Sequence, residues 1–522
     1  MSRISLCAAI LFLAAPLWAQ SKPAATPDPA PILEKLAIPA SHDAALEQLK
    51  KLPASAIVPL FEAVNDDSRP KNIRDDIADA IDAIATRERA VAAKDDAAKD
   101  QAWGASTGLT YYKKLGSNPK WDAKVSQGLQ RIGERNPAGL DDLKAALDAG
   151  CTDPWIRALL AYDSYSLGRI DAGAAAGKFA DLLEDMESSR YPESRKIAVI
   201  SDFLSLSRKG ADANIPDDTR RRALDYAIAH FKDFAADHPG HTLLRQVAAN
   251  LYSAAVPGHD RGTENGRKVV DAIAAALPDD SLSYFFKANF YTEWAWEARG
   301  GGFADTVTDQ GWRTFHERLG DARTFADKGW RLNPLDPDCP TVMIQICMGD
   351  GAERTEMESW FSRAMLADPH NYMGCLAKEQ FLLPKWGGSE KEALEFARSC
   401  VAHGNADDRL PTILVQTYKD ILELSTDPRA TTSTDEYWRD IQSVYQKLLA
   451  DKSRLQAHRA QYLLDRANYL KAACDSEHWK EAAALIKEFG NDIDIKAIGG
   501  QTIYDYDKRK ATEATAGKGT DE

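Results

Sequence analysis

The side chains best suited to binding lie in the middle of the chain, where tryptophans and cations stand beside glycine-rich turns. Trp296 and Arg299 precede the glycines at 300–302, and Trp312 follows them. Lys385 and Trp386 stand in a second such loop, residues 384–389. An indole face can stack on a ligand or hold a cation, and arginine can bind a carboxylate. We expect a binding rim formed by Arg299, Lys385, Trp386, Trp296 and Trp312, which would hold a carboxylate or backbone group of a partner.

Each of these groups also has a structural interpretation. The turn after Arg299 could cradle an anion, but it lacks the lysine spacing of a P-loop and the strand before it. A hinge between helices, with Arg299 paired to a local carboxylate, is the favoured alternative. Lys385 and Trp386 could form a cation–π platform. The favoured alternative is that Trp386 closes the end of a helical hairpin.

Residues suited to metal binding or nucleophilic catalysis are sparse. His238 and His241 lie three positions apart, but a proline and a glycine separate them and no third ligand is apparent. His316 and Glu317 could do acid–base work, although a surface pair is the default interpretation. Neither the His-Glu-x-x-His nor the Gly-x-Ser-x-Gly motif occurs. We therefore expect no metal and no cofactor, and catalysis is left open but is the less favoured expectation.

The cysteines raise the question of a disulfide. The chain has seven, and removal of Cys7 with a signal peptide would leave six. Cys375 begins one helix of an expected antiparallel pair and Cys400 ends the other, so these two ends should lie side by side. A disulfide between Cys375 and Cys400 could form in an oxidising compartment. Buried thiols at the helix interface are the alternative.

Hydrophobic periodicity predicts helices throughout. One apolar stripe at helical spacing contains Met357, Trp360, Phe361, Ala364 and Met365. Proline disfavours helix in the residue before it, so Pro334 and Pro369 mark two corners, 35 positions apart. Tetratricopeptide repeats have a period of about 34 residues. We expect an all-α, tetratricopeptide-like array of helical hairpins, and no alternating strand pattern of useful length occurs.

Two motifs resemble those of a bacterial domain-of-unknown-function family in the tetratricopeptide-like group. The first is the Ala-Trp-Glu-Ala-Arg-Gly-Gly-Gly run at 295–302, and the second is Pro-Lys-Trp-Gly-Gly-Ser at 384–389. The segment at 150–154 is similar to a third motif near the family's start. The resemblance covers about residues 100–405 and implies a helical architecture without an established activity. The usual Trp, Gly and Tyr consensus of the first repeat helix is missing.

The ends of the chain predict its compartment. A basic start and 14 nearly apolar residues at 4–17 are too short for a membrane span and typical of a signal peptide, with cleavage after Ala19. We expect export to the periplasm or beyond, and no membrane span after cleavage. The expected organisation is a signal peptide (1–19), a flexible linker (20–40), an N-terminal helical region (41–100), a central tetratricopeptide-like domain (101–410), C-terminal hairpins (411–505) and a disordered tail (506–522).

Composition narrows the function classes. A net charge of −14 does not suit a nucleic-acid binder. Helical arrays form extended concave surfaces. The leading expectation is therefore a scaffold that binds a protein or peptide. The alternatives are a binder of small molecules or glycans that uses the tryptophans, and an enzyme with an unrecognised site.

Overall fold

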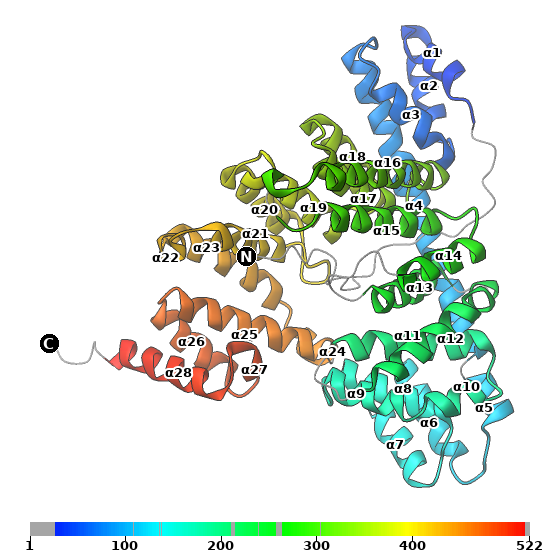
Figure 1. Cartoon of the computed structure of the whole chain (residues 1–522), viewed down its shortest axis with the longest axis vertical. Coiled ribbons are helices and arrows are strands. Elements are labelled where there is room, and N and C mark those ends of the chain that lie inside the picture. The colour runs from blue at the N-terminus through cyan, green and yellow to red at the C-terminus, as the bar shows by residue number, and fades with distance from the viewer. Residues whose placement is uncertain are drawn as a thin grey trace. The chain divides into compact units, whose positions relative to one another are not determined.

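We describe a computed structural model of the chain, covering residues 27–516 except 108, 135, 137, 210–214, 238–239, 257–263 and 303. Within this range every regular element is an α-helix or a short 3-10 helix, and the described residues contain no strand (Figure 1). The all-α, helical-repeat prediction is therefore confirmed. None of the described helices combines the length and apolar character that crossing a bilayer would require.

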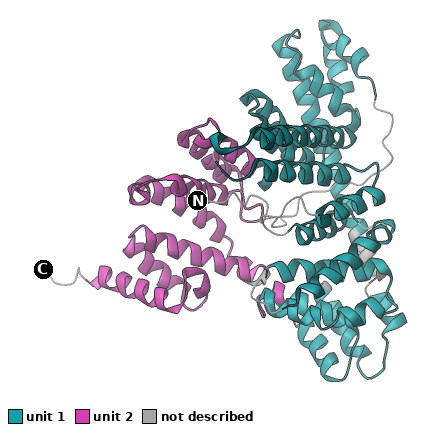
Figure 2. Ribbon diagram, viewed as in Figure 1, with its two compact units in different colours: residues 1, 3–164, 171–374 teal, residues 2, 165–170, 375–522 magenta. Residues whose placement is uncertain are grey.

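The chain divides into two compact units, shown in different colours in Figure 2. The first contains residues 3–164 and 171–374, and the second contains residues 165–170 and 375–522. The boundaries between the units fall inside two helices, after Ser164 and after Gly374.

The first unit begins with a small helical layer. Its elements are α1 (Ala30–Leu36), η1 (Pro39–Ser41), α2 (His42–Leu49), η2 (Ala54–Ala56), α3 (Ile57–Val64) and the long α4 (Lys71–Thr107). Leu33, Ile57 and Ile77 lie in one apolar core with Leu335, which comes from the repeat region. This layer therefore packs on the repeats. Residues 30–36 were expected within a flexible linker but form α1, because Leu33 and Leu36 are buried in that core.

Helices of ordinary length follow α4. They are α5 (Leu109–Leu115), α6 (Asp122–Gly133), α7 (Gly139–Asp148), α8 (Pro154–Ser166), α9 (Ala172–Ala180), α10 (Leu183–Ser188), α11 (Glu193–Lys209), α12 (Asp217–Ala236), α13 (His241–Ala255) and α14 (Glu264–Ala276).

The repeat hairpins of the first unit are α15 (Ser281–Arg299) with α16 (Asp309–Leu332), and α17 (Asp338–Asp350) with α18 (Arg354–Ala367); η3 (Ala304–Thr306) precedes α16. Consecutive helices of this set pack on one another, as the green helices of Figure 1 show. Pro334 follows the end of α16, and Pro369 follows the end of α18, as predicted. Trp360 and Met357 are buried, as the predicted stripe requires.

The second unit contains most of α19 (Tyr372–Leu382) and the remaining helices. These are η4 (Pro384–Trp386), α20 (Glu390–His403), α21 (Thr412–Leu424), α22 (Pro428–Thr432), α23 (Asp435–Leu449), α24 (Arg454–Ala457), α25 (Arg459–Asp475), α26 (Trp479–Phe489), α27 (Ile495–Ile498) and α28 (Gln501–Ala516). The expected disordered tail at 506–522 is helical as far as Ala516. Tyr504, Asp507 and Ala511 are buried at helical spacing, and α28 packs on α26.

Candidate functional site

The candidate site lies where α15 ends. Gly300 has a φ of +78°, a backbone conformation that only glycine adopts readily, and its N–H donates to Trp296 O at 3.0 Å. Thr308 caps the start of α16 with its side chain, which accepts from Gly311 N at 3.0 Å. The glycine turn therefore ends one helix and lets the next run back along it, which brings Trp312 beside Trp296.

Arg299 lies between these two tryptophans. The centre of its guanidinium is 5.6 Å from the ring centroid of Trp296 and 5.2 Å from that of Trp312. Its Nη1 donates to Gly300 O at 3.1 Å and to Gly302 O at 3.0 Å. On α16, His316 stacks on Trp312 with an interplanar angle of 17°. We call Trp296, Arg299, Trp312 and His316 the Arg299 site.

The electrostatic surroundings of Arg299 differ from those of Arg323, which lies on the second helix of the same hairpin. Among the residues that the structure describes, no carboxylate pairs with Arg299, whereas Arg323 pairs with both Asp350 and Glu356. Partial burial lowers the pKa of Arg299 from its ordinary value. The expected pairing with a local carboxylate is therefore wrong: two carbonyls and two indole faces fix this cation instead.

The aromatic run of α15 mostly supports this site from within. Phe286 and Phe290 are buried. Trp296 also contacts the buried Phe315, with ring centroids 4.9 Å apart. Trp294 is only half-buried, and it carries the guanidinium of Arg318 at 3.6 Å from its ring centroid.

Lys385 and Trp386 belong to the second unit, so they are described with that unit. They form η4, which is followed by Gly387 in the left-handed conformation at a φ of +89°. A Cβ on Gly388 would lie 2.0 Å from Leu382 O, so the loop requires glycine there. Ser389 caps the helix that follows this loop: its hydroxyl accepts from Glu392 N and donates to the Glu392 carboxylate.

Sequence reasoning missed a buried acidic group beside this loop. Glu379 of α19 is fully buried. The side-chain nitrogen Nε2 of Gln380 donates to Glu379 Oε2 at 3.0 Å and to Asp420 Oδ2 at 2.7 Å. Burial, reinforced by the charge of Asp420, raises the pKa of Glu379 to about 8, although Lys385 opposes the change. Glu379 therefore holds a proton at neutral pH. No local sequence signal marks it, because acidic residues are abundant and Asp420 lies on another helix.

A second missed feature is a buried ionic network in the first unit. Arg245 of α13 binds Asp338 of α17 through two nitrogens, one of them at 2.6 Å. The backbone N–H of His241 donates to Asp96 of α4, and both ring nitrogens of His241 are buried without a hydrogen bond to a described residue. This network joins α4 and α17 to α13.

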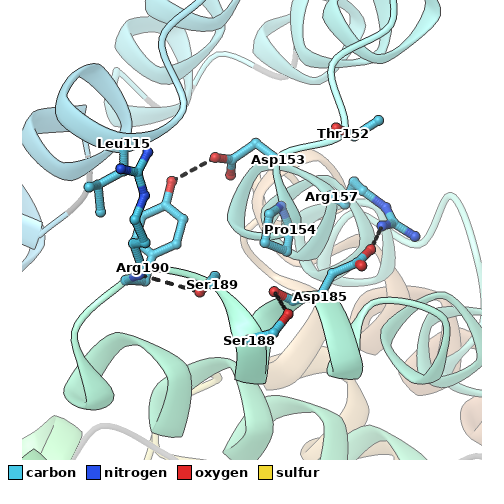
Figure 3. A pocket seen from close by; sticks show the side chains of 10 residues that line it. Leu115, Thr152, Asp153, Pro154, Arg157, Asp185, Ser188, Ser189 and Arg190 are labelled. Carbon is cyan, nitrogen blue, oxygen red and sulfur yellow. Dashed lines mark hydrogen bonds and ion pairs between the residues drawn. The ribbon is translucent and has the colours of Figure 1, made fainter.

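The first unit also contains a polar hollow of about 590 Å³ (Figure 3). Asp153 lies on its wall and accepts from the Tyr191 hydroxyl at 2.9 Å and from two N–H groups at the start of α8. Arg157 pairs with Asp185 at 2.7 Å. Because these charged side chains are already engaged within the protein, the hollow is a weaker candidate than the Arg299 site.

The described residues include no group of three or more His, Cys, Asp or Glu that could hold a metal ion. His238 lies outside them. Cys375 and Cys400 are both buried as thiols and no disulfide joins them, so the alternative to the disulfide is the one observed. Burial raises the pKa of Cys347 and of Cys474 to about 12 in each case, which leaves these thiols protonated and poor nucleophiles.

Comparison with known proteins adds no relative: no family model and no curated protein matches this chain. The resemblance to a domain-of-unknown-function family stays a prediction based on the motifs at 295–302 and 384–389.

Proposed function

We propose that this chain is an exported helical-repeat protein that binds a protein partner, with the Arg299 site holding a carboxylate or carbonyl of that partner. The observation that carries the proposal is the half-buried Arg299, immobilised against Trp296 and Trp312 without a carboxylate among the described residues. Its planar fork has five N–H donors, and its hydrogen bonds to Gly300 and Gly302 use Nη1 alone.

The immobilisation of Arg299 favours binding over a purely structural role. Association normally costs about 0.5–1.5 kcal/mol for each flexible side chain that becomes ordered at an interface. Two aromatic faces and two carbonyls already order Arg299, so much of that cost is met before a partner arrives. Exposed His316 and half-buried Trp312 extend the site with flat surfaces of the kind that protein interfaces favour.

Export is part of the proposal and rests on the N-terminal sequence alone. Residues 1–26 lie outside the described part of the structure. N-terminal sequencing of the mature protein should begin at Gln20. An intact Met1 on a cytosolic species would contradict export.

Site-directed photocrosslinking in the native envelope tests the binding proposal. A benzoylphenylalanine at exposed His316 should give a discrete protein adduct, while the same group at exposed Lys391 of the second unit serves as the matched control. The adduct should be identified by mass spectrometry and its binding repeated with the two purified proteins. Arg299→Ala should weaken that binding at least tenfold with an unchanged melting temperature.

Arg299→Lys separates charge from geometry, because lysine keeps the charge but lacks the planar fork. An intermediate affinity is expected for this variant. Adduct formation that is unchanged in Arg299→Ala would show that the Arg299 site does not contact the partner. Saturable binding to a glycan array that is lost in Trp312→Ala would favour the glycan-binding alternative instead.

A further inference from the structure

A second surface runs along the α15–α16 hairpin and alternates cations with aromatic rings. On α15, Tyr284, Lys287, Tyr291 and Trp294 follow the spacing i, i+3, i+7 and i+10, which places them on one helix face. Arg318, Phe325 and Lys328 occupy the corresponding face of α16. We call these seven residues the cation–aromatic strip.

Contacts across the two helices make the strip continuous. Lys328 Nζ lies 4.7 Å from the ring centroid of Tyr284, and Lys287 Nζ lies 5.3 Å from the same centroid and 5.6 Å from that of Phe325. Tyr291 contacts Phe325 with ring centroids 5.3 Å apart, and it contacts Trp294 at 5.7 Å. Arg318 lies over Trp294 and donates to its carbonyl oxygen at 2.7 Å. The strip is therefore an ordered surface rather than a set of separate side chains.

The strip is partly open to solvent, and none of its three cations forms an ion pair with a described residue, although Glu297 and Glu317 lie near Arg318 and Asp279 lies near Lys328. Lys328 is exposed, and Lys287, Tyr291, Trp294 and Phe325 are half-buried. Arg318 donates its side-chain hydrogen bond to a carbonyl, that of Trp294, so this bond leaves the charge of Arg318 without a paired carboxylate. The protein as a whole carries a net charge of −14, whereas the seven residues of the strip include three cations and no carboxylate.

We propose that the cation–aromatic strip binds an extended acidic segment of a partner protein, with its carboxylates on the cations and an apolar side chain on the rings. This inference rests on the proposed function, since it names the class of partner. Charge complementarity at a partly desolvated surface supplies specificity and speeds encounter.

The spacing of the cations sets the spacing of the acidic residues. Arg318 and Lys328 lie ten residues apart on α16, which is about 15 Å at 1.5 Å per residue. An extended chain rises about 3.3 Å per residue and presents every second side chain to one face. Two acidic residues four positions apart therefore match the two ends, and the residue midway between them would face Phe325 and Tyr291.

Asp321 restricts what the middle of the segment can be. It is exposed and lies between Arg318 and Phe325 on the same helix face. A third acidic residue at the centre of the bound segment would meet this carboxylate and be repelled. The strip should thus prefer a segment with an acidic, an apolar and an acidic residue at every second position over a segment that is acidic throughout.

Fluorescence anisotropy with a labelled peptide tests the proposal on the full chain. The probe has glutamate, serine, leucine, serine and glutamate as its core. Two comparison peptides are used: one has both glutamates changed to glutamine, and the other has glutamate in place of leucine. Saturable binding of the first probe should weaken at least tenfold in the glutamine version and in the double variant Lys287→Gln/Lys328→Gln. Replacing leucine by glutamate should weaken binding more in the wild type than in Asp321→Asn.

Lys391→Gln, an exposed site on α20, is the matched control and should leave the affinity unchanged. Arg318→Gln extends the test to the other end of the strip, with circular dichroism as the check on folding. Three results would overturn the inference: absence of saturable binding at millimolar peptide, equal binding by the lysine double variant, or tighter binding of a single-stranded oligonucleotide through the same lysines. The proposed function has a separate readout, because an Arg299-dependent adduct at position 316 does not require this strip.

Discussion

Replacing Glu379 by glutamine should change how stability depends on pH. The folded-state pKa of Glu379 is raised from 4.5 to about 8, chiefly by burial. A group with a raised folded-state pKa contributes stability that is complete below its unfolded pKa and is lost as pH rises through its folded pKa. Between pH 5 and pH 9 the loss in the wild type is about 4 kcal/mol, since each pH unit below pH 8 contributes about 1.4 kcal/mol. Glutamine has no proton to lose, so Glu379→Gln should lack this slope.

The assay compares wild type and Glu379→Gln by urea unfolding at pH 5 and pH 9, together with hydrogen exchange of the α19 and α21 peptides. Hydrogen exchange reports the second unit separately, which is needed because a chain with two units need not unfold in one step. The stability of the variant relative to wild type should rise by about 4 kcal/mol between the two pH values. Glu423→Gln is the matched control, because Glu423 is exposed on α21.

A stability difference between wild type and Glu379→Gln that is the same at pH 5 and pH 9 would refute this reasoning. It would mean that Glu379 is ionised in the folded protein at neutral pH and that the local charges outweigh its burial. If the pH dependence of the unfolding free energy disappears equally in Glu423→Gln, it arises from the acidic residues in general and not from buried Glu379.

Three further outcomes are expected. Phe290→Ala should lower the free energy of unfolding, measured by urea titration, by about 3–5 kcal/mol because it leaves a cavity in place of a buried ring. A loss below about 1 kcal/mol would mean that neighbouring side chains move in and fill the cavity. Asp338→Ala should lower the free energy of unfolding by at most about 3–5 kcal/mol, because it removes the paired carboxylate from Arg245, which is only half-buried, and the double replacement Arg245→Met/Asp338→Leu should recover most of the loss. Cys375 and Cys400 should react with iodoacetamide only after unfolding; an intact mass lower by two hydrogens without reductant would instead show a disulfide.

The parts of the fold that were predictable from sequence depend on interactions within a few residues. Pro334 and Pro369 end helices because a proline restricts the residue before it, whatever the rest of the chain does. Ser389 caps α20 by a bond to a residue three positions away. The proximity of Trp296, Arg299 and Trp312 was also predictable, since a glycine turn reverses the chain between them.

Tertiary structure decided which acidic side chains are protonated, which residues distant in sequence contact one another, and how far the helices extend toward the ends of the chain. Glu379 and Asp420 become neighbours only because α19 and α21 pack together, and the pKa of a carboxyl depends on how completely remote segments exclude water from it. Asp96 and the backbone of His241 meet across 145 positions of sequence. Polar residues 506–516 are helical because α26 covers one face of α28. Helix propensity and capping act locally and can be read from the sequence, whereas burial is a property of the assembled fold.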